Sequence, residues 1–353
     1  MIAVNARFLT QPLTGVQRFA LEISRTLKEI SGEENIQFFA PKNIQLYSEA
    51  NELNVQIIGS HTGHLWEQLD LPRHLKTLGN PILLNFCNTA PIFYKNKLST
   101  LHDITYIRYP QTFSKSFRYF YQVMMPLVLK TSKHIFTVSE FSKKEISEYY
   151  HTTKEKISVV YNAVGKTFHP QIDENLKKEN YLLAVSSIKE NKNFKMILNA
   201  FEEASKQIDN LKLFVIGDLK NNNFSNIDLN VFVNNSRIKL LGRVGDTELT
   251  KYYSNAIAFL FPSLYEGFGI PVLEAQACGC PVIASNAASM PEVLKKSAIL
   301  VNPFSLENFV QAIYNVAHNT EYRKQLVELG FQNQSEFSWK QSGLKFFQIC
   351  KTV

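Results

Sequence analysis

Short apolar runs, each about the length of a strand, alternate with amphipathic stretches in the first half of the chain. The apolar runs begin at Ile2, Ile36, Val55, Ile82, Leu98, His134 and Ile157. Stretches with helical spacing, such as Val16–Ile30 and Phe141–Tyr150, separate several of them. Alternation of this kind predicts a parallel β-sheet with helices on both faces, a doubly wound α/β domain.

The same alternation begins again in the second half. A polar, charged segment, Gly165 to Asn180, follows the last apolar run of the first half and is the best candidate for a domain boundary. Later apolar runs begin at Tyr181, Leu211, Arg237, Ala256, Pro281 and Ala298. The pattern therefore predicts a second doubly wound domain, with the boundary after residue 165.

Composition and charge narrow the class of protein. The chain has 353 residues, 45% of them hydrophobic and 20% charged, which suits a globular protein of two domains. Its net charge of +7 favours an anionic partner, which could be a nucleotide, a membrane surface or a nucleic acid. The four cysteines lack metal-ligand spacing, and no apolar run is long enough to span a bilayer, so we expect a cytoplasmic protein with reduced thiols.

One segment carries the clearest chemical signal. Phe261 to Ser285 reads FPSLYEGFGIPVLEAQACGCPVIAS and predicts a strand, a glycine turn, a helix with Pro271 in its first turn, and a second strand. Glycines allow close approach of a ligand, and N–H groups at a helix start attract anions. The carboxylates of Glu266 and Glu274 suit sugar hydroxyls, so the segment favours a nucleotide sugar. By spacing alone, an ordinary strand-turn-helix corner fits equally well.

Glu266 and Glu274 are the first and last residues of a segment that matches EGFGxPxxE. This segment resembles the donor-binding motif of the retaining glycosyltransferases of family 4, and the resemblance runs over nearly the whole chain. It implies the GT-B fold, in which two doubly wound, Rossmann-like domains face a cleft. Residues 1–165 would form the acceptor-side domain and 166–335 the nucleotide-sugar-binding domain. Residues 336–353 would form a helix that packs back on the first domain.

The resemblance also implies roles for individual residues on the donor side. Glu266 would contact hydroxyls of the donor sugar, and Glu274 would contact the ribose. Val244, in the segment LGRVGD, would lie near the nucleobase. The backbone that would cradle the diphosphate belongs to Gly267, Phe268, Gly269 and Ile270.

A second donor-side segment, SSIKENKN (Ser186–Asn193), resembles the family's loop in which a cationic residue and a lysine meet the diphosphate. Lys192 occupies the position of that lysine. The arginine common in this loop is absent, because Ser187 and Asn191 occupy its usual positions. Either Lys189 compensates for the missing arginine, or backbone N–H groups hold more of the phosphate charge.

Two features of the first half resemble acceptor-side or sugar-binding elements of the family. Gly15 lies in a loop that faces the donor phosphates and the acceptor in the family, although Thr14 replaces a glycine there and no GxGxxG is present. His102 and Asp103 end a predicted strand. A lone histidine is more often structural, but LHDITYIRYP resembles the HDL segment of bacterial mannosyl- and rhamnosyltransferases, which implies that His102 lies near the reacting sugar with Asp103 beside it.

Other segments resemble the family without a chemical role. Ser139, in VSEFS, is predicted to cap a helix. The segment LWEQLDLP (Leu65–Pro72) has no predicted function beyond an acceptor-side wall. Between Lys95 and Lys133, basic and aromatic residues are interleaved, which fits a surface for anionic lipid headgroups. A half-buried helix with an aromatic stripe fits about as well, and no recognised nucleic-acid module supports nucleic-acid binding.

Together these features predict a retaining hexosyltransferase that uses a nucleotide sugar. A GDP-sugar carrying mannose or a rhamnose-like hexose is the first choice of donor, and a UDP-sugar is the alternative. The acceptor would be a glycan, plausibly linked to polyprenyl diphosphate, in O-antigen or capsule synthesis at the inner membrane face. No metal is expected, because no Asp-x-Asp motif stands out at a strand end. A degenerate protein that binds a nucleotide sugar as a scaffold is the competing class.

Overall fold

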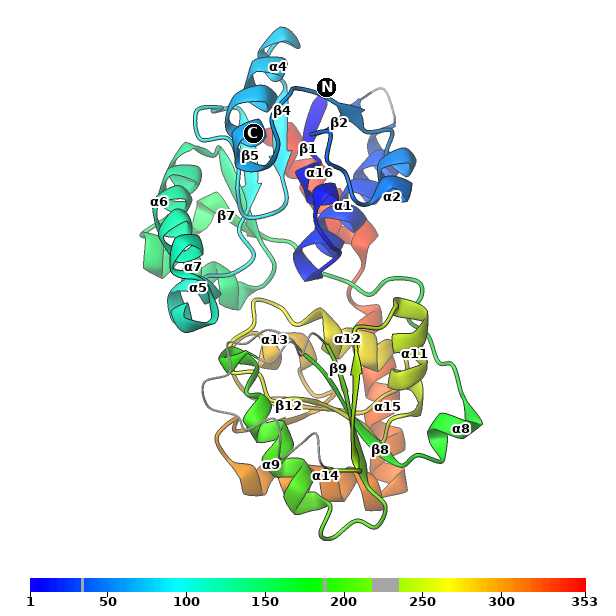
Figure 1. The fold of residues 1–353 in the computed structure, drawn as a ribbon. Helices are drawn as coiled ribbons and strands as arrows, with labels where there is room; N and C mark the ends of the chain where they lie inside the picture. Colours follow the sequence, from blue (N-terminus) through cyan, green and yellow to red (C-terminus); the bar gives the residue numbers. More distant parts are fainter. Residues whose placement is uncertain (33–34, 187–188, 218–234) are drawn as a thin grey trace. The chain divides into compact units, whose positions relative to one another are not determined.

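The computed structural model describes residues 1–32, 35–186, 189–217 and 235–353. The chain forms two compact α/β units, which are drawn in Figure 1 and are described separately below. The first unit comprises Met1–Asn162 and the C-terminal Ser338–Val353, and the second comprises Ala163–Phe337. The chain therefore leaves the first unit shortly before the boundary expected after residue 165 and returns to it for its last helix.

The first unit contains a seven-stranded parallel sheet in the order β3-β2-β1-β4-β5-β6-β7. The strands are β1 (Ile2–Asn5), β2 (Ile36–Ala40), β3 (Gln56–Ile57), β4 (Ile82–Asn85), β5 (Lys97–Thr100), β6 (His134–Thr137) and β7 (Ile157–Val159). The strand order runs outward in both directions from the β1–β4 pair. The carboxyl ends of these two central strands form the topological switch point, where ligands bind in open α/β sheets.

Helices cover both faces of the first sheet. The principal ones are α1 (Gly15–Ser31), α2 (Tyr47–Glu52), α4 (Leu71–Thr77), α5 (Thr105–Arg108), α6 (Lys115–Thr131), α7 (Glu140–Tyr150) and α16 (Trp339–Thr352). A single turn, α3 (Gly63–Leu65), and a π-helical turn, Trp66–Asp70, precede α4. The last helix, α16, packs along α1, with the Phe346 ring stacked 3.6 Å from that of Phe136 and the Ser342 hydroxyl donating to the Tyr161 carbonyl at 2.7 Å.

The second unit contains a six-stranded parallel sheet in the order β10-β9-β8-β11-β12-β13. The strands are β8 (Tyr181–Val185), β9 (Lys212–Ile216), β10 (Ile238–Gly242), β11 (Ala258–Phe261), β12 (Val282–Ser285) and β13 (Ile299–Val301). The helices are α8 (Glu174–Lys177), α9 (Phe194–Ala204), α11 (Asp246–Asn255), α12 (Ile270–Ala277), α13 (Met290–Leu294), α14 (Leu306–His318) and α15 (Thr320–Ser335). Here the order reverses between β8 and β11, which form the second switch point.

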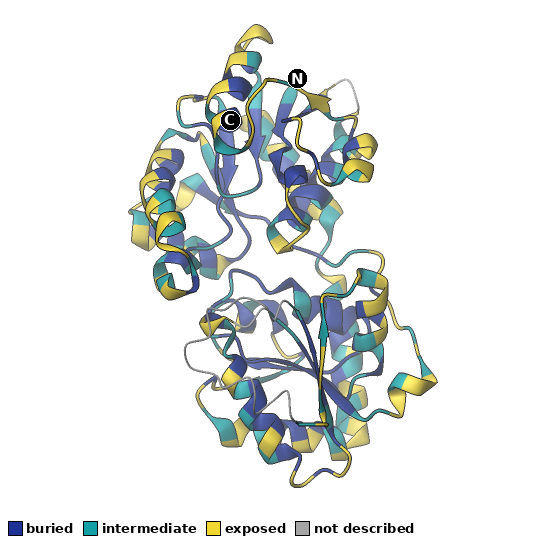
Figure 2. Cartoon of the chain, viewed as in Figure 1, coloured by how far each residue is buried: buried dark blue, intermediate teal, exposed yellow. Residues whose placement is uncertain are grey.

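The predicted fold class, α/β with two doubly wound sheets, is confirmed. Figure 2 shows why the apolar runs predicted it, since the central strands are buried and the helices are exposed only on their outer faces. All residues of β11 and β12 are buried, as is typical of parallel strands covered on both faces. Ser139 caps α7 as predicted, because its hydroxyl accepts from the Ser142 N–H at 2.9 Å.

One local prediction is wrong. The apolar run that starts at Ile2 continues to Leu9, but the strand ends at Asn5 and Arg7–Thr10 form a 3₁₀ helix. The reason is a side-chain interaction, because the Asn5 carboxamide oxygen accepts from the Arg7 backbone N–H at 3.2 Å and turns the chain. The turn directs the side chain of Arg7 to the carboxyl end of the sheet.

Candidate active site

The two segments that are predicted to bind the donor lie together at the switch point of the second unit. The SSIKENKN segment leaves the carboxyl end of β8, and PSLYEGFG leaves the carboxyl end of β11, its hydrogen-bonded neighbour. Because parallel strands end at the same edge of a sheet, the two loops lie side by side although 74 residues separate Lys192 from Glu266. The sheet order therefore brings together two segments that the sequence related only through the predicted donor.

Three interactions join these loops. The Lys192 ammonium forms an ion pair with the Glu266 carboxylate, and their side chains are 23% and 12% exposed. The Asn191 carbonyl accepts from the Leu264 N–H at 2.7 Å, and the Asn191 side-chain amide donates to the Tyr265 carbonyl at 3.2 Å. Lys192 and Glu266 are thus held together at the edge of the sheet, within reach of solvent.

Asn191 has a structural role that the sequence did not indicate. It occupies one of the two positions where the resemblance leads one to expect an arginine, and its side chain is buried against the EGFG turn. The other position, Ser187, lies outside the described residues. Lys189 is exposed and begins the 3₁₀ turn that carries Lys192.

The glycine turn has a backbone that only glycine tolerates well. Gly269 has φ +88° and precedes the first residue of α12, and a Cβ at this position would lie 2.5 Å from the terminal methyl carbon of Met290. The Ser289 hydroxyl donates to the carbonyls of Glu266 and Phe268, at 3.0 and 3.1 Å. The turn is therefore held from three sides, by α12, by the segment after β12 and by the loop after β8.

The remaining donor-side residues lie in the same unit. Glu274 is in the middle of α12 and is 6% exposed, so its carboxylate is largely removed from solvent. Gly267, Phe268 and Ile270 are buried in the turn. Val244 is half-buried just beyond the carboxyl end of β10, at the outer edge of the same side of the sheet.

His102 lies at the carboxyl end of β5 in the first unit. Its Nε2 lies 2.7 Å from the Phe86 carbonyl, which can only accept, so Nε2 carries the proton. Burial lowers the pKa of His102, and the ring is therefore neutral near pH 7, with Nδ1 unprotonated. A neutral imidazole in this state can accept a hydrogen bond from a hydroxyl group through Nδ1.

The two other first-unit candidates have different surroundings. The Asp103 carboxylate accepts from the Thr105 N–H at 2.8 Å and thereby starts the short helix α5. Gly15 is the exposed first residue of α1. Within the part of the chain that the structure describes, no cluster of three or more His, Cys, Asp or Glu residues could hold a metal ion.

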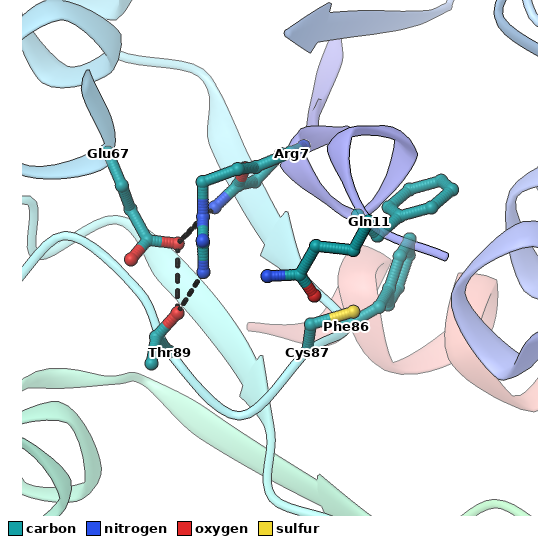
Figure 3. Close-up of a pocket in the computed structure, with 8 residues that line it drawn as sticks. Arg7, Gln11, Glu67, Phe86, Cys87 and Thr89 are labelled. Atoms are coloured by element: carbon teal, nitrogen blue, oxygen red, sulfur yellow. Dashed lines mark hydrogen bonds and ion pairs between the residues drawn. The ribbon is translucent and has the colours of Figure 1, made fainter. Parts of the chain in front are cut away.

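A buried polar network at the first switch point was not predicted. Figure 3 shows its centre, the Arg7 guanidinium, held by Glu67 and Thr89. Arg7 Nε lies 3.3 Å from Glu67 Oε1, and Arg7 Nη2 donates to the Thr89 hydroxyl at 2.8 Å. The Asn5 amide joins this network by donating to Glu67 Oε1 at 2.8 Å and to Asn85 Oδ1 at 3.0 Å.

Glu67 is ionised in this network. Its side chain is 1% exposed, and although burial opposes ionisation, Arg7 and the hydrogen bonds of His64 and Asn5 lower its pKa to about 2. The available sequence signals were two polar residues, Asn5 and Arg7, inside an apolar run, and the segment LWEQLDLP without a role. Neither signal indicated a contact, because Arg7 and Glu67 are 60 residues apart.

The basic segment from Lys95 to Lys133 requires a correction at Lys97. Its side chain is fully buried, and its ammonium donates to the Tyr94 carbonyl at 2.8 Å and the Thr131 hydroxyl at 2.7 Å, so it adds no charge to the surface.

Helix α6 has one buried face and one exposed face. The buried face fits the interpretation of a half-buried helix, and the exposed face remains available for the predicted lipid contact. Met124, Met125, Val128 and Leu129 are buried, and the large apolar side chains that are exposed on this helix are Tyr119, Val123 and Leu127. No helix in the described ranges is long and apolar enough to cross a membrane.

The fold and the paired loops define a class of protein, the GT-B glycosyltransferases. The structure resembles that of HepE from Anabaena in complex with UDP and glucose, with a TM-score of 0.75, 14% sequence identity and coverage of 100% of this chain and 99% of the other. At this identity the likeness shows the fold alone.

The chain belongs to the group 1 glycosyltransferases. The model of that family, "Glycosyl transferases group 1", matches residues 166–332. An uncharacterized glycosyltransferase of Methanocaldococcus jannaschii is 30% identical over 253 residues, which cover 70% of this chain and 67% of that protein. An O-antigen chain mannosyltransferase of Salmonella typhimurium is 34% identical over 233 residues, which cover 65% of this chain. The match spans 63% of the Salmonella protein's own length.

Proposed function

We propose that this protein is a retaining hexosyltransferase that moves a hexose from a nucleotide sugar to a glycan hydroxyl. The observation that carries the proposal is the Lys192–Glu266 pair at the β8–β11 switch point, beside the EGFG turn. An ammonium and a carboxylate at one strand edge match the two chemical parts of a nucleotide sugar, its diphosphate and its hydroxyls. Both side chains are partly exposed, so a ligand can replace the contact between them.

On the donor side, Lys192 binds the diphosphate as a point charge, with Lys189 as a second cation. The backbone of the glycine turn at the start of α12 supplies further N–H groups. Glu266 accepts hydrogen bonds from hydroxyls of the sugar, and Glu274 from those of the ribose. His102, neutral and protonated at Nε2, orients a hydroxyl of the reacting sugar through Nδ1.

The transfer we propose occurs on one face of the sugar. The bond between sugar C1 and the oxygen of the β-phosphate breaks, and the acceptor oxygen bonds to C1 from the same side. The acceptor proton passes to the leaving phosphate oxygen, so no protein carboxylate becomes bonded to the sugar. Lys192 and the helix start stabilise the charge that develops on the diphosphate, an effect that supplies several kcal/mol in comparable sites. Isolation of a glycosyl-enzyme adduct on any side chain would contradict this mechanism.

Mannose from GDP-mannose is our first choice of donor. The support is the HDL-like segment at His102 and the identity of 34% to the Salmonella O-antigen chain mannosyltransferase. The acceptor is then a growing surface polysaccharide on a polyprenyl diphosphate carrier. The exposed Tyr119, Val123 and Leu127 of α6, with the exposed Lys115 and Lys130 on the same helix, supply a surface for peripheral contact with anionic lipids.

A screen of nucleotide sugars tests the proposed function directly. GDP-, UDP- and dTDP-sugars are added to the full chain, and thermal unfolding and slow donor hydrolysis are followed. We expect a GDP-sugar to raise the melting temperature with concentration and to be hydrolysed, and Glu266→Ala to abolish hydrolysis. Binding without hydrolysis or transfer would support the scaffold alternative, whereas stabilisation by UDP-sugars alone would change the donor. No stabilisation by any of them would refute the proposal.

A further inference from the structure

We propose that the cavity beside Arg7 in the first unit binds one non-reacting hydroxyl group of the sugar acceptor, through the Arg7 guanidinium and the Gln11 amide. The inference rests on the proposed glycosyl transfer and adds to it a named acceptor subsite. The cavity is lined by Asn5, Arg7, Phe8, Gln11, Glu67, Phe86, Cys87 and Thr89 (Figure 3).

The position of the cavity is the first argument. Asn5 is the last residue of β1 and Asn85 the last residue of β4, and the strand order of the first sheet reverses between these two strands. Their side chains hydrogen-bond to each other under Arg7. The network therefore lies at the switch point of its sheet, the place where the second unit carries Lys192 and Glu266.

The hydrogen bonding of Arg7 is the second argument. Arg7 is 8% exposed, and Nε and Nη2 are used by Glu67 and Thr89. The hydrogen bonds of the guanidinium to residues that the structure describes do not use Nη1. This nitrogen is not among the buried polar atoms without a partner, so it is accessible and can donate to an oxygen atom of a ligand or of solvent.

Size and charge decide which kind of oxygen fits. The cavity has a volume of about 10 Å³, room for one water-sized group and too little for a phosphate. Glu67 is ionised and offsets the charge of Arg7, so the network offers no net charge to an anion. A neutral hydroxyl meets both conditions.

Gln11 gives the cavity a rim. The residue is exposed in the loop between the 3₁₀ helix and α1, and its side-chain amide nitrogen lies on the Arg7 side in Figure 3. Its oxygen accepts from the Gln17 amide at 2.6 Å, which orients the Gln11 nitrogen as the remaining donor. A hydroxyl oxygen in the cavity can accept from Arg7 Nη1 and from Gln11 Nε2 together.

The cavity is also connected to His102. Phe86 lines it, and the Phe86 carbonyl is the group that accepts from His102 Nε2 at 2.7 Å. A sugar hydroxyl beside Arg7 therefore lies next to the segment that orients the imidazole assigned to the reacting sugar. This continuity is expected of an acceptor site.

The test uses methyl α- and β-glycosides of mannose, glucose, galactose and rhamnose as acceptors, with the donor that the full chain hydrolyses. The variants are Gln11→Met, which removes both amide atoms from an exposed side chain, and Arg7→Lys, which keeps the charge. Gln45→Met, also exposed, is the matched control. We expect KM for the acceptor to rise about tenfold in Arg7→Lys and several-fold in Gln11→Met, since each loses one hydrogen bond to the acceptor. The change should be larger in the acceptor KM than in the donor KM or in acceptor-free donor hydrolysis. Gln45→Met should change all three by less than about twofold, an effect too small for even one neutral hydrogen bond.

Other outcomes would refute either the acceptor subsite or the proposed function. If Gln11→Met folds normally and leaves the acceptor KM unchanged while Glu266→Ala still abolishes donor hydrolysis, the subsite is wrong and the proposed function stands. If no glycoside accepts the sugar or slows donor hydrolysis at its highest soluble concentration, the subsite is also rejected. Competition by inorganic phosphate against the glycoside would mark an anion site and overturn the hydroxyl assignment. Absence of donor hydrolysis in the wild-type chain would instead refute the proposed function.

Discussion

The two units carry a pair of opposite charges at the same topological position but bury it to different depths. In the second unit, the side chains of Lys192 and Glu266 are 23% and 12% exposed, whereas in the first unit the side chains of Arg7 and Glu67 are 10% and 1% exposed. A partly exposed pair can exchange its partner for a ligand at small cost. A buried pair cannot separate without leaving a charge unsolvated. The Arg7–Glu67 pair therefore stays together as a fixed framework, and only Arg7 Nη1 is left to bind a further group.

The comparison predicts that the buried pair matters most for stability. Glu67→Ala should lower the free energy of unfolding of the first unit by about 3–5 kcal/mol, because Arg7 remains as a buried charge without its partner. Both tryptophans, Trp66 and Trp339, lie in the first unit, so tryptophan fluorescence during urea unfolding reports on that unit. Glu52→Ala, which removes an exposed ion pair with Arg25, is the control and should cost less than about 1 kcal/mol. Equal losses in the two variants would contradict the framework role.

The partly exposed pair should instead matter most for activity. Glu266→Gln is expected to lower kcat/KM by about 10²–10³, the order of the loss in rate when one preorganised hydrogen-bonding group of an active site is removed. The melting temperature should fall less than in Glu67→Ala, because the Lys192–Glu266 pair is less deeply buried than the Arg7–Glu67 pair. Glu307→Gln, an exposed change on α14, provides a matched control. A variant that keeps wild-type activity would remove Glu266 from the site.

Acid should affect the first unit through Glu67. Its pKa is lowered from 4.5 to about 2 in the folded chain, so the contribution of this group is present above pH 4.5 and is lost as the pH falls toward 2. The difference corresponds to about 3 kcal/mol. Tryptophan-monitored unfolding at several pH values should show this loss in the wild type and a flatter profile in Glu67→Gln. The same slope in both proteins would show that another group controls the acid sensitivity.

A smaller effect is expected at the glycine turn. Ser289→Ala removes the hydroxyl that donates to the Glu266 and Phe268 carbonyls and should cost about 1–2 kcal/mol. Because these contacts hold the turn that we assign to the diphosphate, the stabilisation by the nucleotide sugar should also weaken. Thermal shift with and without the nucleotide sugar measures both, and Ser335→Ala, at an exposed serine of α15, is the control. An unchanged ligand effect would separate Ser289 from donor binding.

The sequence alone predicted the parts of the site that lie within one short segment. The turn from Glu266 to Glu274 could be recognised because its glycines, its proline and its two carboxylates are neighbours along the chain. Lys192 was found by the same kind of local match, although its contact with Glu266 depends on β8 and β11 being adjacent strands. The roles of these residues in binding and transfer remain predictions.

Other features required the tertiary structure because their causes are distant in the sequence. Lys97 read as a surface charge, yet carbonyls at the end of the preceding loop and a hydroxyl on α6 satisfy its ammonium in the interior. In the sequence, Asn191 only marked a position where an arginine was expected. In the structure, its side chain connects the loop after β8 to the loop after β11. The pattern of polar residues could not reveal either arrangement, because each depends on partners that local spacing does not identify.

The amino-acid sequence determined the fold class and the glycine turn with its two carboxylates. Alternating apolar and amphipathic segments can be buried only as parallel sheets covered by helices, and a glycine turn with flanking carboxylates is a local property of the chain. The tertiary structure decided which strand ends meet and therefore which charges pair. Arg7 and Glu67 are 60 residues apart, and only the order of the strands in the first sheet brings them together with Thr89 around one small cavity.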